Sequence, residues 1–337
     1  MKLTMNLAQK SYDIIIQRAE LKNAHKYFNL QRKVLILTDS GVPAQYAQTV
    51  AAQCKESLIV TVDSGEGSKC LENVGKICEQ MLKNGFSRTD AAVAVGGGVV
   101  GDLCGFVSSC YQRGIDFYNI PTTLLSQLDS SIGGKTAVNL AGVKNCVGAF
   151  YQPKGVLIDP DTLATLDRRQ LASGLAEAIK MSATSDSALF EFIENENIEE
   201  NIEEIIYRSL TIKKNVVEQD ECESGLRRVL NFGHTVGHGI ESVAGMSGLL
   251  HGESVALGML YLCSPDVRER LVKVLKKANL PTSYDVDFDA VVEAMKHDKK
   301  CDGEKIRYIY VDKIGSFCEY TSLFCDFVKM IKEKNGI

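Results

Sequence analysis

Histidine and carboxylate side chains in the second half of the chain have the types and spacing of a divalent-metal site. Three of the five histidines are His234, His238 and His251. His234 and His238 are four positions apart and would share one face of a helix. Imidazole suits zinc. The nearest upstream carboxylate in a small, apolar helical run is Glu177, which would be costly to bury unpaired. Spacing alone leaves open which two histidines bind metal, and whether the pair is simply packed or exposed.

A glycine-rich turn in the first half has the form of an anion-binding loop. Residues 96–101 (GGGVVG) match G-x-G-x-x-G, although they follow the fourth predicted strand rather than the first. Bare backbone amides at a helix N-terminus can hold a pyrophosphate. The alternative is a tight turn without ligand, in which Asp102 would only stabilise the helix dipole.

A second polar segment, residues 121–136 (PTTLLSQLDSSIGGKT), ends like a P-loop. Asp129 replaces the leading glycine of that motif, so we reject a nucleoside triphosphatase. Hydroxyl groups and glycines nevertheless surround one acid and one base, Asp129 and Lys135, and Lys144 and Asn145 follow. For each lysine alone, a solvated loop is the alternative.

Composition indicates an ordinary soluble protein. The 337 residues allow two domains with ample core, and apolar and charged residues make up 45% and 24%. The net charge of −5 gives no reason to expect a nucleic-acid partner, and small basic groups beside glycine-rich turns suit an anionic small molecule. Eleven cysteines without a C-x-x-C pair suggest reduced thiols. With no signal peptide and no membrane-spanning apolar run, a cytoplasmic location is expected.

Alternation of apolar and amphipathic runs predicts a parallel sheet in the first half. We expect strands at residues 12–17, 33–39, 58–62 and 91–95, one helix after Pro43 and another ending near residue 84. Ligands of such sheets bind beyond the carboxyl ends of the strands. After residue 159 the pattern is helical, and only residues 306–311 and 317–320 look like strands. The acidic run 191–204 is expected to be a solvated amphipathic helix.

The chain resembles the 3-dehydroquinate synthases. The matching stretches follow the family order and are residues 96–103, 111–115, 121–136, 144–145, 174–180, 225–227, 230–238, 251–253 and 298–300. The resemblance implies an α/β NAD-binding domain with a parallel sheet at residues 1–159. It also implies a mainly α-helical metal- and substrate-binding domain at residues 160–337.

The resemblance further implies a phosphate-eliminating lyase that needs NAD and a divalent metal, usually Zn²⁺ with Co²⁺ as an alternative. The substrate would be 3-deoxy-D-arabino-heptulosonate 7-phosphate, and the products 3-dehydroquinate and phosphate, in the second step of the shikimate pathway. Transient oxidation by NAD would precede elimination of phosphate, return of the hydride and an intramolecular aldol closure. We expect a homodimer.

Site residues follow from their positions in the matching stretches. The metal ligands implied are Glu177, His234 and His251. The catalytic residues implied are His238, Glu223, Lys135 and Asp129. The substrate-binding residues implied are Arg113, Asn145, Lys180, Lys213, Arg227, Asn231 and Lys299, with Lys300 fitting equally well at the last position. The nucleotide contacts implied are Asp39, Glu66, Lys69, Gly98, Val99, Val100, Gly101, Asp102, Thr122, Thr123, Lys135, Lys144, Thr162, Leu163, Ala164 and Thr165.

Three other functions stay open. Another sugar phosphate cyclase would share the metal and NAD residues, but Lys135, Asn145, Arg227 and Lys299 favour a carboxylated substrate. A metal-dependent polyol dehydrogenase would accumulate NADH without releasing phosphate. A non-catalytic binding protein on this scaffold would have lost reacting residues, and every one that we can match is present.

Overall fold

The computed structural model describes residues 1–8, 10–245, 248–296, 301–302 and 305–335, and the chain divides into two compact units. The first unit is Met1–Leu166 and the second is Asp167–Ile337. The division falls at the start of helix α4 (Arg168–Ser185), where the Asp167 side chain accepts hydrogen bonds from the first free backbone N–H groups of the helix.

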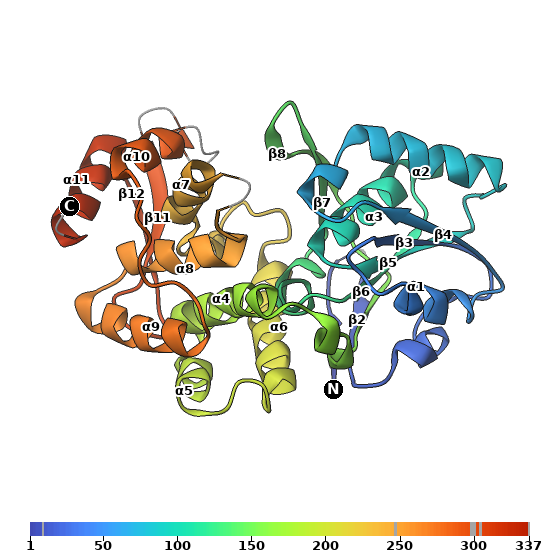
Figure 1. Cartoon of the computed structure of the whole chain (residues 1–337), viewed down its shortest axis with the longest axis horizontal. Coiled ribbons are helices and arrows are strands. Elements are labelled where there is room, and N and C mark those ends of the chain that lie inside the picture. The colour runs from blue at the N-terminus through green and yellow to red at the C-terminus, as the bar shows by residue number, and fades with distance from the viewer. Residues whose placement is uncertain (9, 246–247, 297–300, 303–304, 336–337) are drawn as a thin grey trace. The chain divides into compact units, whose positions relative to one another are not determined.

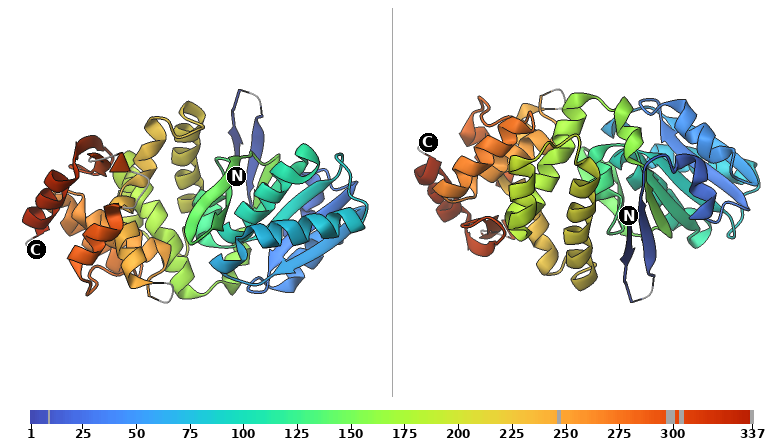
Figure 2. Two further views of the ribbon diagram at one scale, coloured as in Figure 1. Left: turned by 90° about the horizontal axis from the view of Figure 1, so that it is seen from above. Right: turned by 90° about the horizontal axis from the view of Figure 1, so that it is seen from below.

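The first unit is built around a seven-stranded sheet with the order β1-β2-β9-β6-β5-β3-β4. Only β1 and β2 pair antiparallel, and Figure 2 shows them projecting from the sheet as a ribbon. The strands are β1 (Lys2–Met5), β2 (Tyr12–Ile16), β3 (Lys33–Asp39), β4 (Glu56–Val62), β5 (Ala91–Gly96), β6 (Asp116–Pro121) and β9 (Gly155–Ile158). The four strands predicted in this region are confirmed to within two residues at each end, whereas β1, β6 and β9 have no counterpart in the prediction.

Helices cover both faces of this sheet. Side chains of one strand alternate between faces, so Leu35 and Leu37 pack toward α2 and α3 while Val34 and Ile36 pack toward α1. In Figure 1, α2 and α1 lie on opposite sides of β3. The helices and short turns of the unit are η1 (Leu21–Lys26), α1 (Ala44–Ala51), η2 (Glu66–Ser68), α2 (Leu71–Lys83), α3 (Gly98–Cys110), η3 (Tyr111–Arg113), η4 (Ser126–Ser130) and η5 (Pro160–Thr165).

A separate antiparallel ribbon packs against α3. It consists of β7 (Lys135–Leu140) and β8 (Val143–Phe150), with a register shift between Val138 and Leu140. A Cβ at Gly105 would lie 2.4 Å from Cγ2 of Thr136, so only glycine lets α3 approach the ribbon this closely. Lys135, for which a solvated loop was the alternative, is the first residue of strand β7.

The second unit is mainly helical, as predicted. Its helical elements are α4 (Arg168–Ser185), α5 (Ser187–Asn195), α6 (Ile202–Gln219), η6 (Leu226–Asn231), α7 (His234–Ala244), α8 (His251–Tyr261), α9 (Pro265–Lys277), α10 (Phe288–Lys296) and α11 (Phe324–Asn335). The strands are β10 (Cys301–Asp302), β11 (Lys305–Tyr310) and β12 (Cys318–Leu323), in one antiparallel sheet. None of the helices in the described residues is long and apolar enough to cross a membrane.

The single helix predicted over residues 191–204 is wrong. Helix α5 ends at Asn195 and α6 begins at Ile202. Between them, Oδ1 of Asn197 accepts hydrogen bonds from the backbone N–H groups of Glu199 and Glu200, at 3.0 and 3.3 Å. Such local side-chain bonds compete with the helical pattern and interrupt the helix here.

Candidate metal centre and nucleotide site

Three helices of the second unit bring together one carboxylate and two imidazoles. Glu177 lies on α4, His234 opens α7 and His251 opens α8. One ligand atom from each lies within 4.8 Å of the others. Nε2 of His234 and Nε2 of His251 are each 3.7 Å from Oε1 of Glu177. A zinc ion bonded at about 2.0–2.2 Å holds neighbouring ligand atoms roughly 3–4 Å apart, so the separations fit.

Glycines allow these helices to approach closely enough. A Cβ at Gly258 on α8 would lie 2.0 Å from the carbonyl oxygen of Gly233, and one at Gly237 on α7 would lie 2.8 Å from the carbonyl oxygen of Ser254. Gly233 itself has φ +77°, in the left-handed region that favours glycine. The glycines around the histidines therefore allow α7 and α8 to pack in close contact.

The Nδ1 nitrogen of each of these two imidazoles has its own partner. Nδ1 of His234 is 3.2 Å from the carbonyl oxygen of Phe232, and Nδ1 of His251 is 3.1 Å from Oε2 of Glu241. A proton on each Nδ1 leaves Nε2 as a lone-pair donor toward Glu177, the arrangement usual for histidines that bind metal. Burial would lower the pKa of His251, but the hydrogen bond to Glu241 and the nearby carboxylates outweigh it and raise that pKa.

Glu177 offers a buried carboxylate oxygen that suits a cation. The residue is 1% exposed, and its Oε2 forms an ion pair with Nζ of Lys180. Its Oε1 is buried and has no hydrogen-bond partner. Leaving a buried carboxylate oxygen unsatisfied is costly. An unpartnered oxygen facing two imidazole nitrogens is a donor set that suits a divalent metal.

His238 lies beside this group but outside it. Its ring centroid is 5.3 Å from that of His234 and 5.8 Å from that of His251. His251 is about as close to His234, with ring centroids 5.2 Å apart, but the group of ligand atoms within 4.8 Å of one another belongs to Glu177, His234 and His251. This grouping favours that set over the simple helical pair of His234 and His238. The His238 imidazole therefore lies next to the two histidines of this group.

Three buried cations lie in the same unit, where α4, α6 and η6 pack against one another. Lys180, Lys213 and Arg227 are 2%, 5% and 2% exposed. Charged side chains are seldom buried this fully unless they are paired. On the neighbouring loop, Nδ2 of Asn231 donates a 3.2 Å hydrogen bond to Oε1 of Glu223. These are the groups that the resemblance implies for anion binding and proton transfer.

Asp220 organises this loop, and sequence reasoning missed it. Its Oδ1 accepts from the backbone N–H and the hydroxyl of Ser224, and its Oδ2 accepts from the N–H groups of Gly225 and Arg227, at 2.7–3.0 Å. Burial alone would raise the pKa of Asp220, but these donors lower it to about 2. An aspartate just after a helix and four residues before Ser-Gly was the pattern that could have revealed it.

In the first unit, α3 starts directly after β5, at the carboxyl edge of the sheet. Its N-cap is Gly97, where a Cβ would lie 2.9 Å from Cγ2 of Thr123. The N-terminal turn contains Gly98, Val99, Val100 and Gly101.

Asp102 does more than face the helix dipole, because its Oδ2 is 2.7 Å from Nζ of Lys69. Lys69 is 4% exposed and also donates to Oδ1 of Asn145. Glu66 is 3.6 Å from the same ammonium group.

A hollow of about 390 Å³ lies where β3 and β4 end. It is lined by residues 38–44 and Thr61. Oδ1 of Asp39 accepts a 2.8 Å hydrogen bond from the N–H of Gly41, which holds the carboxylate at the edge of the hollow. The hollow is a surface at which the predicted contact from Asp39 to a nucleotide could form.

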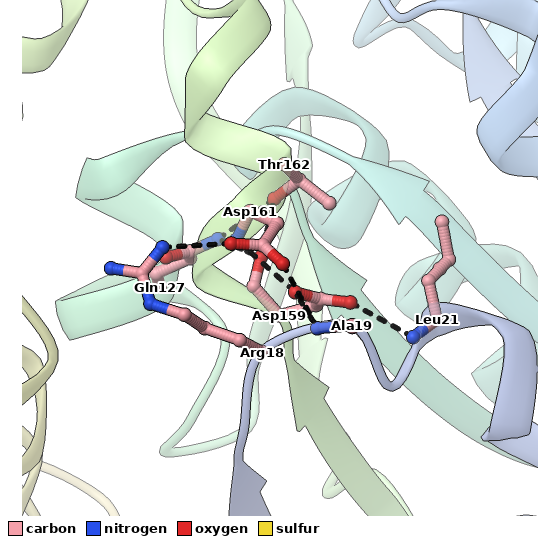
Figure 3. Close-up of polar contacts among 7 residues, drawn as sticks. All are labelled: Arg18, Ala19, Leu21, Gln127, Asp159, Asp161 and Thr162. Atoms are coloured by element: carbon pink, nitrogen blue, oxygen red, sulfur yellow. Dashed lines mark hydrogen bonds and ion pairs between the residues drawn. The ribbon is translucent and has the colours of Figure 1, made fainter.

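The predicted nucleotide segment 162–165 is held in place by Asp159, which is 2% exposed. The Asp159 carboxylate accepts from the N–H groups of Ala19, Leu21 and Asp161, and its carbonyl oxygen accepts from Gln127 and Thr162. Figure 3 shows this network, which contains Arg18, Ala19, Leu21, Gln127, Asp159, Asp161 and Thr162. The network ties η5 to η4, the element that contains Asp129.

The remaining predicted residues are distributed as follows. Arg113 is exposed in η3 with φ +65°, an uncommon conformation for a side-chain-bearing residue. Lys135 begins β7, and Lys144 and Asn145 lie on β8. Thr122 is buried, and its N–H donates to the carbonyl oxygen of Gly96. Lys299 and Lys300 lie outside the described residues.

Comparison with known proteins gives consistent matches over nearly the whole chain. The model of the 3-dehydroquinate synthase N-terminal region matches residues 59–173, and that of the C-terminal region matches residues 174–301. The 3-dehydroquinate synthase of Streptococcus mutans serotype c is 43% identical over 337 aligned positions, covering 94% of this chain and 95% of the relative.

Two solved structures of sugar phosphate cyclases are also similar. A 2-deoxy-scyllo-inosose synthase complexed with carbaglucose-6-phosphate, NAD⁺ and Co²⁺ has a TM-score of 0.88 at 26% identity, over 99% of this chain and 100% of that one. A 2-epi-5-epi-valiolone synthase from Streptomyces hygroscopicus with NAD⁺ and Zn²⁺ bound has a TM-score of 0.86 at 28% identity, over 97% of each chain.

Proposed function

Because this chain belongs to the 3-dehydroquinate synthase family, we propose that it converts 3-deoxy-D-arabino-heptulosonate 7-phosphate into 3-dehydroquinate and phosphate. It would act in the shikimate pathway as a carbon–oxygen lyase without net oxidation. The observation that carries the proposal is the buried Oε1 of Glu177, which has no hydrogen-bond partner and faces Nε2 of both His234 and His251.

Glu177, His234 and His251 would hold a divalent ion, Zn²⁺ or Co²⁺. A site with two histidines and one glutamate leaves a coordination position for oxygens of a substrate. When bound, the metal polarises those oxygens and NAD accepts and returns one hydride. The role of the protein is to hold both imidazole Nε2 atoms toward the carboxylate, which the contacts of Nδ1 with Phe232 and Glu241 support.

NAD would bind to the first unit. The N–H groups of the first turn of α3, from Gly98 to Val100, would hold the pyrophosphate, because unpaired amides at a helix N-terminus favour anions. Gly101, whose N–H donates to the carbonyl oxygen of Gly97, is proposed as a contact on its position in the motif. Asp39 would accept hydrogen bonds from the adenosine end at the hollow beside β3. The remaining predicted contacts, Glu66, Lys69, Asp102, Thr122, Thr123, Lys135, Lys144 and residues 162–165, are proposed on their positions in the family motifs.

The substrate carries a carboxylate and a phosphate, so cations must neutralise both. Lys180, Lys213 and Arg227 are buried in the second unit and would supply that charge. A guanidinium grips a carboxylate or phosphate with two parallel hydrogen bonds, while an ammonium acts as a point charge. Further polar contacts would come from Arg113, Asn145, Asn231 and Lys299.

Proton transfer would fall to His238 and Glu223, with Lys135 and Asp129 assisting. The His238 imidazole lies beside the candidate ligands, so it could take a proton from a substrate group held there. Glu223 has φ +60°, and Asn231 donates to its carboxylate. The hydrogen bond from Asn231 would keep the Glu223 carboxylate oriented while it exchanges a proton.

We also propose that the protein is a homodimer in the cytoplasm. The β7–β8 ribbon exposes Leu140, Val143 and Phe150, apolar surface that a second copy could cover. Among the cysteines whose side chains are described, none forms a disulfide, as suits a reducing compartment. Sedimentation equilibrium of the purified protein would test the dimer, and a single monomeric species would contradict it.

The test of function is to measure phosphate and NADH together, with the heptulosonate phosphate as substrate. We expect phosphate release without NADH accumulation, loss of activity after treatment with a chelator and recovery on adding Zn²⁺ or Co²⁺. The substitution His251→Ala should remove bound metal and activity together. Turnover of another heptulose phosphate or a hexose phosphate, with none of the heptulosonate phosphate, would reveal a different cyclase. Sustained NADH production without phosphate would reveal a dehydrogenase.

A further inference from the structure

One face of α4 meets the start of α8 at three successive positions. Arg169, Ser173 and Glu177 are spaced four residues apart, so they share a face of the helix. They contact Glu253, Gly252 and His251 respectively. We propose that the Arg169–Glu253 ion pair is a positioning device that presets the distance between His251 and Glu177, and so the affinity for metal. This inference rests on the proposed metal site.

The ion pair has two parallel contacts. Nε of Arg169 is 2.6 Å from Oε1 of Glu253, and Nη2 is 2.7 Å from Oε2. The same Nη2 donates to the carbonyl oxygen of Gly248 at 2.7 Å. Glu253 is 6% exposed, and its Oε2 also accepts from the backbone N–H of Leu250 at 2.7 Å. One buried carboxylate therefore both caps the start of α8 and fastens it to α4.

The backbone between Glu253 and His251 is also fixed to α4. The N–H of Gly252 donates a 3.1 Å hydrogen bond to Oγ of Ser173. A Cβ at Gly252 would lie only 1.9 Å from the carbonyl oxygen of Ser173. The two helices are thus in backbone contact at the residue that follows His251, and little movement of that histidine is possible while the contact lasts.

His251 needs such support more than the other two ligands. Its side chain is 37% exposed, against 12% for His234 and 2% for Glu177. Like His234 in α7, it occupies the first turn of its helix, where backbone N–H groups have no partner within the helix and fraying is easiest, but His251 is the more exposed of the two. If the start of α8 loosens, Nε2 of His251 moves away from Oε1 of Glu177, and metal binding must then order the turn at a cost in free energy.

The opposite charges of Arg169 and Glu253 make it possible to distinguish a positioning role from a purely electrostatic effect on metal affinity. The substitution Arg169→Met removes a positive charge, which by Coulomb's law favours binding of a cation, whereas Glu253→Gln removes a negative charge and disfavours it. A positioning role predicts that both substitutions weaken metal binding, because both break the same ion pair. Loss of an outer contact of this kind typically costs about 10-fold to 100-fold in metal affinity.

The experiment measures Zn²⁺ affinity of the metal-free full-length protein by competition with a chromophoric chelator, and the visible absorption of the Co²⁺ form. Arg270→Met is the matched control, because Arg270 and Glu194 form a similar two-contact ion pair at 3.2 and 2.6 Å in the same unit. We expect Arg169→Met and Glu253→Gln each to weaken Zn²⁺ binding about 10-fold or more and to alter the Co²⁺ spectrum. Arg270→Met should change affinity less than about twofold.

The outcomes separate this inference from the proposed metal site. If His251→Ala abolishes binding but Arg169→Met matches the wild type, the positioning inference is wrong and the site stands. If His251→Ala binds Zn²⁺ as the wild type does, the site itself is wrong. Tighter binding in Arg169→Met with weaker binding in Glu253→Gln would mean that charge alone acts. Should Arg169→Met fail to fold, Arg169→Lys, which keeps the charge but not the two parallel contacts, should still weaken binding.

Discussion

The carboxylate of Asp220 is expected to hold the loop that contains Glu223 and Arg227. Its two oxygens accept from the N–H groups of Ser224, Gly225 and Arg227 and from the Ser224 hydroxyl. In Asp220→Asn, one oxygen becomes an NH₂ group. Either Ser224, or Gly225 together with Arg227, then faces a donor instead of an acceptor.

The magnitude follows from the pKa. The donors lower the pKa of Asp220 from 3.8 to about 2, and a shift of this size corresponds to roughly 2 kcal/mol of stabilisation of the ionised, closed loop. Because the pKa in the folded state is depressed, this stabilisation is complete above about pH 4 and is lost as the pH falls toward 2. At neutral pH, loss of 2 kcal/mol raises the population of the open loop roughly 30-fold.

Amide hydrogen exchange, read by mass spectrometry on peptides covering residues 221–228, measures this opening directly. Asp220→Asn should speed exchange of the amides of Ser224, Gly225 and Arg227 by roughly 30-fold at pH 7. Asp287→Asn is the control, since Asp287 accepts from the N–H groups at the start of α10 and leaves this loop untouched. At pH 3 the difference in opening free energy should shrink by about half. Equal exchange in wild type and Asp220→Asn, or equal loosening in the control, would refute the reasoning.

Three further substitutions test the metal centre. His238→Ala should keep one metal ion per chain by elemental analysis while slowing phosphate release about 100-fold or more, and loss of metal would instead support the helical histidine pair. Glu241→Ala should weaken Zn²⁺ about 10-fold in chelator competition, because Nδ1 of His251 loses its acceptor; unchanged affinity would show that this acceptor does not matter. Gly258→Ala should lower Tm by several degrees, because its Cβ would meet the carbonyl oxygen of Gly233 at 2.0 Å; an unchanged Tm would contradict the close packing of α7 and α8.

Two strands of the first unit, β3 and β5, could be predicted because they are apolar almost throughout. Strands β3 and β5 are buried on both faces, and continuous apolar runs reveal them. Strand β6 (DFYNIP) was missed because Asp116, Asn119 and Pro121 interrupt its pattern, although the strand lies between β5 and β9. Its burial follows from its neighbours in the sheet rather than from its own composition.

The metal centre shows a similar limit. Helical periodicity pairs His234 with His238, whereas the geometry groups His234 with His251, which lies on another helix. That grouping depends on contact between α7 and α8 at Gly233 and Gly258. Contacts between two helices cannot be recognised from the periodicity of either helix's sequence. Asp220 escaped notice for a related reason, because its role depends on the turn that the following residues adopt.

The most direct measurement of the central claim is anomalous diffraction at the zinc edge from crystals of the protein loaded with Zn²⁺. The account predicts one strong peak per chain, about 2.0–2.2 Å from Oε1 of Glu177 and from Nε2 of His234 and His251. A peak held by His234 and His238 without Glu177, or no peak near these side chains, would contradict it.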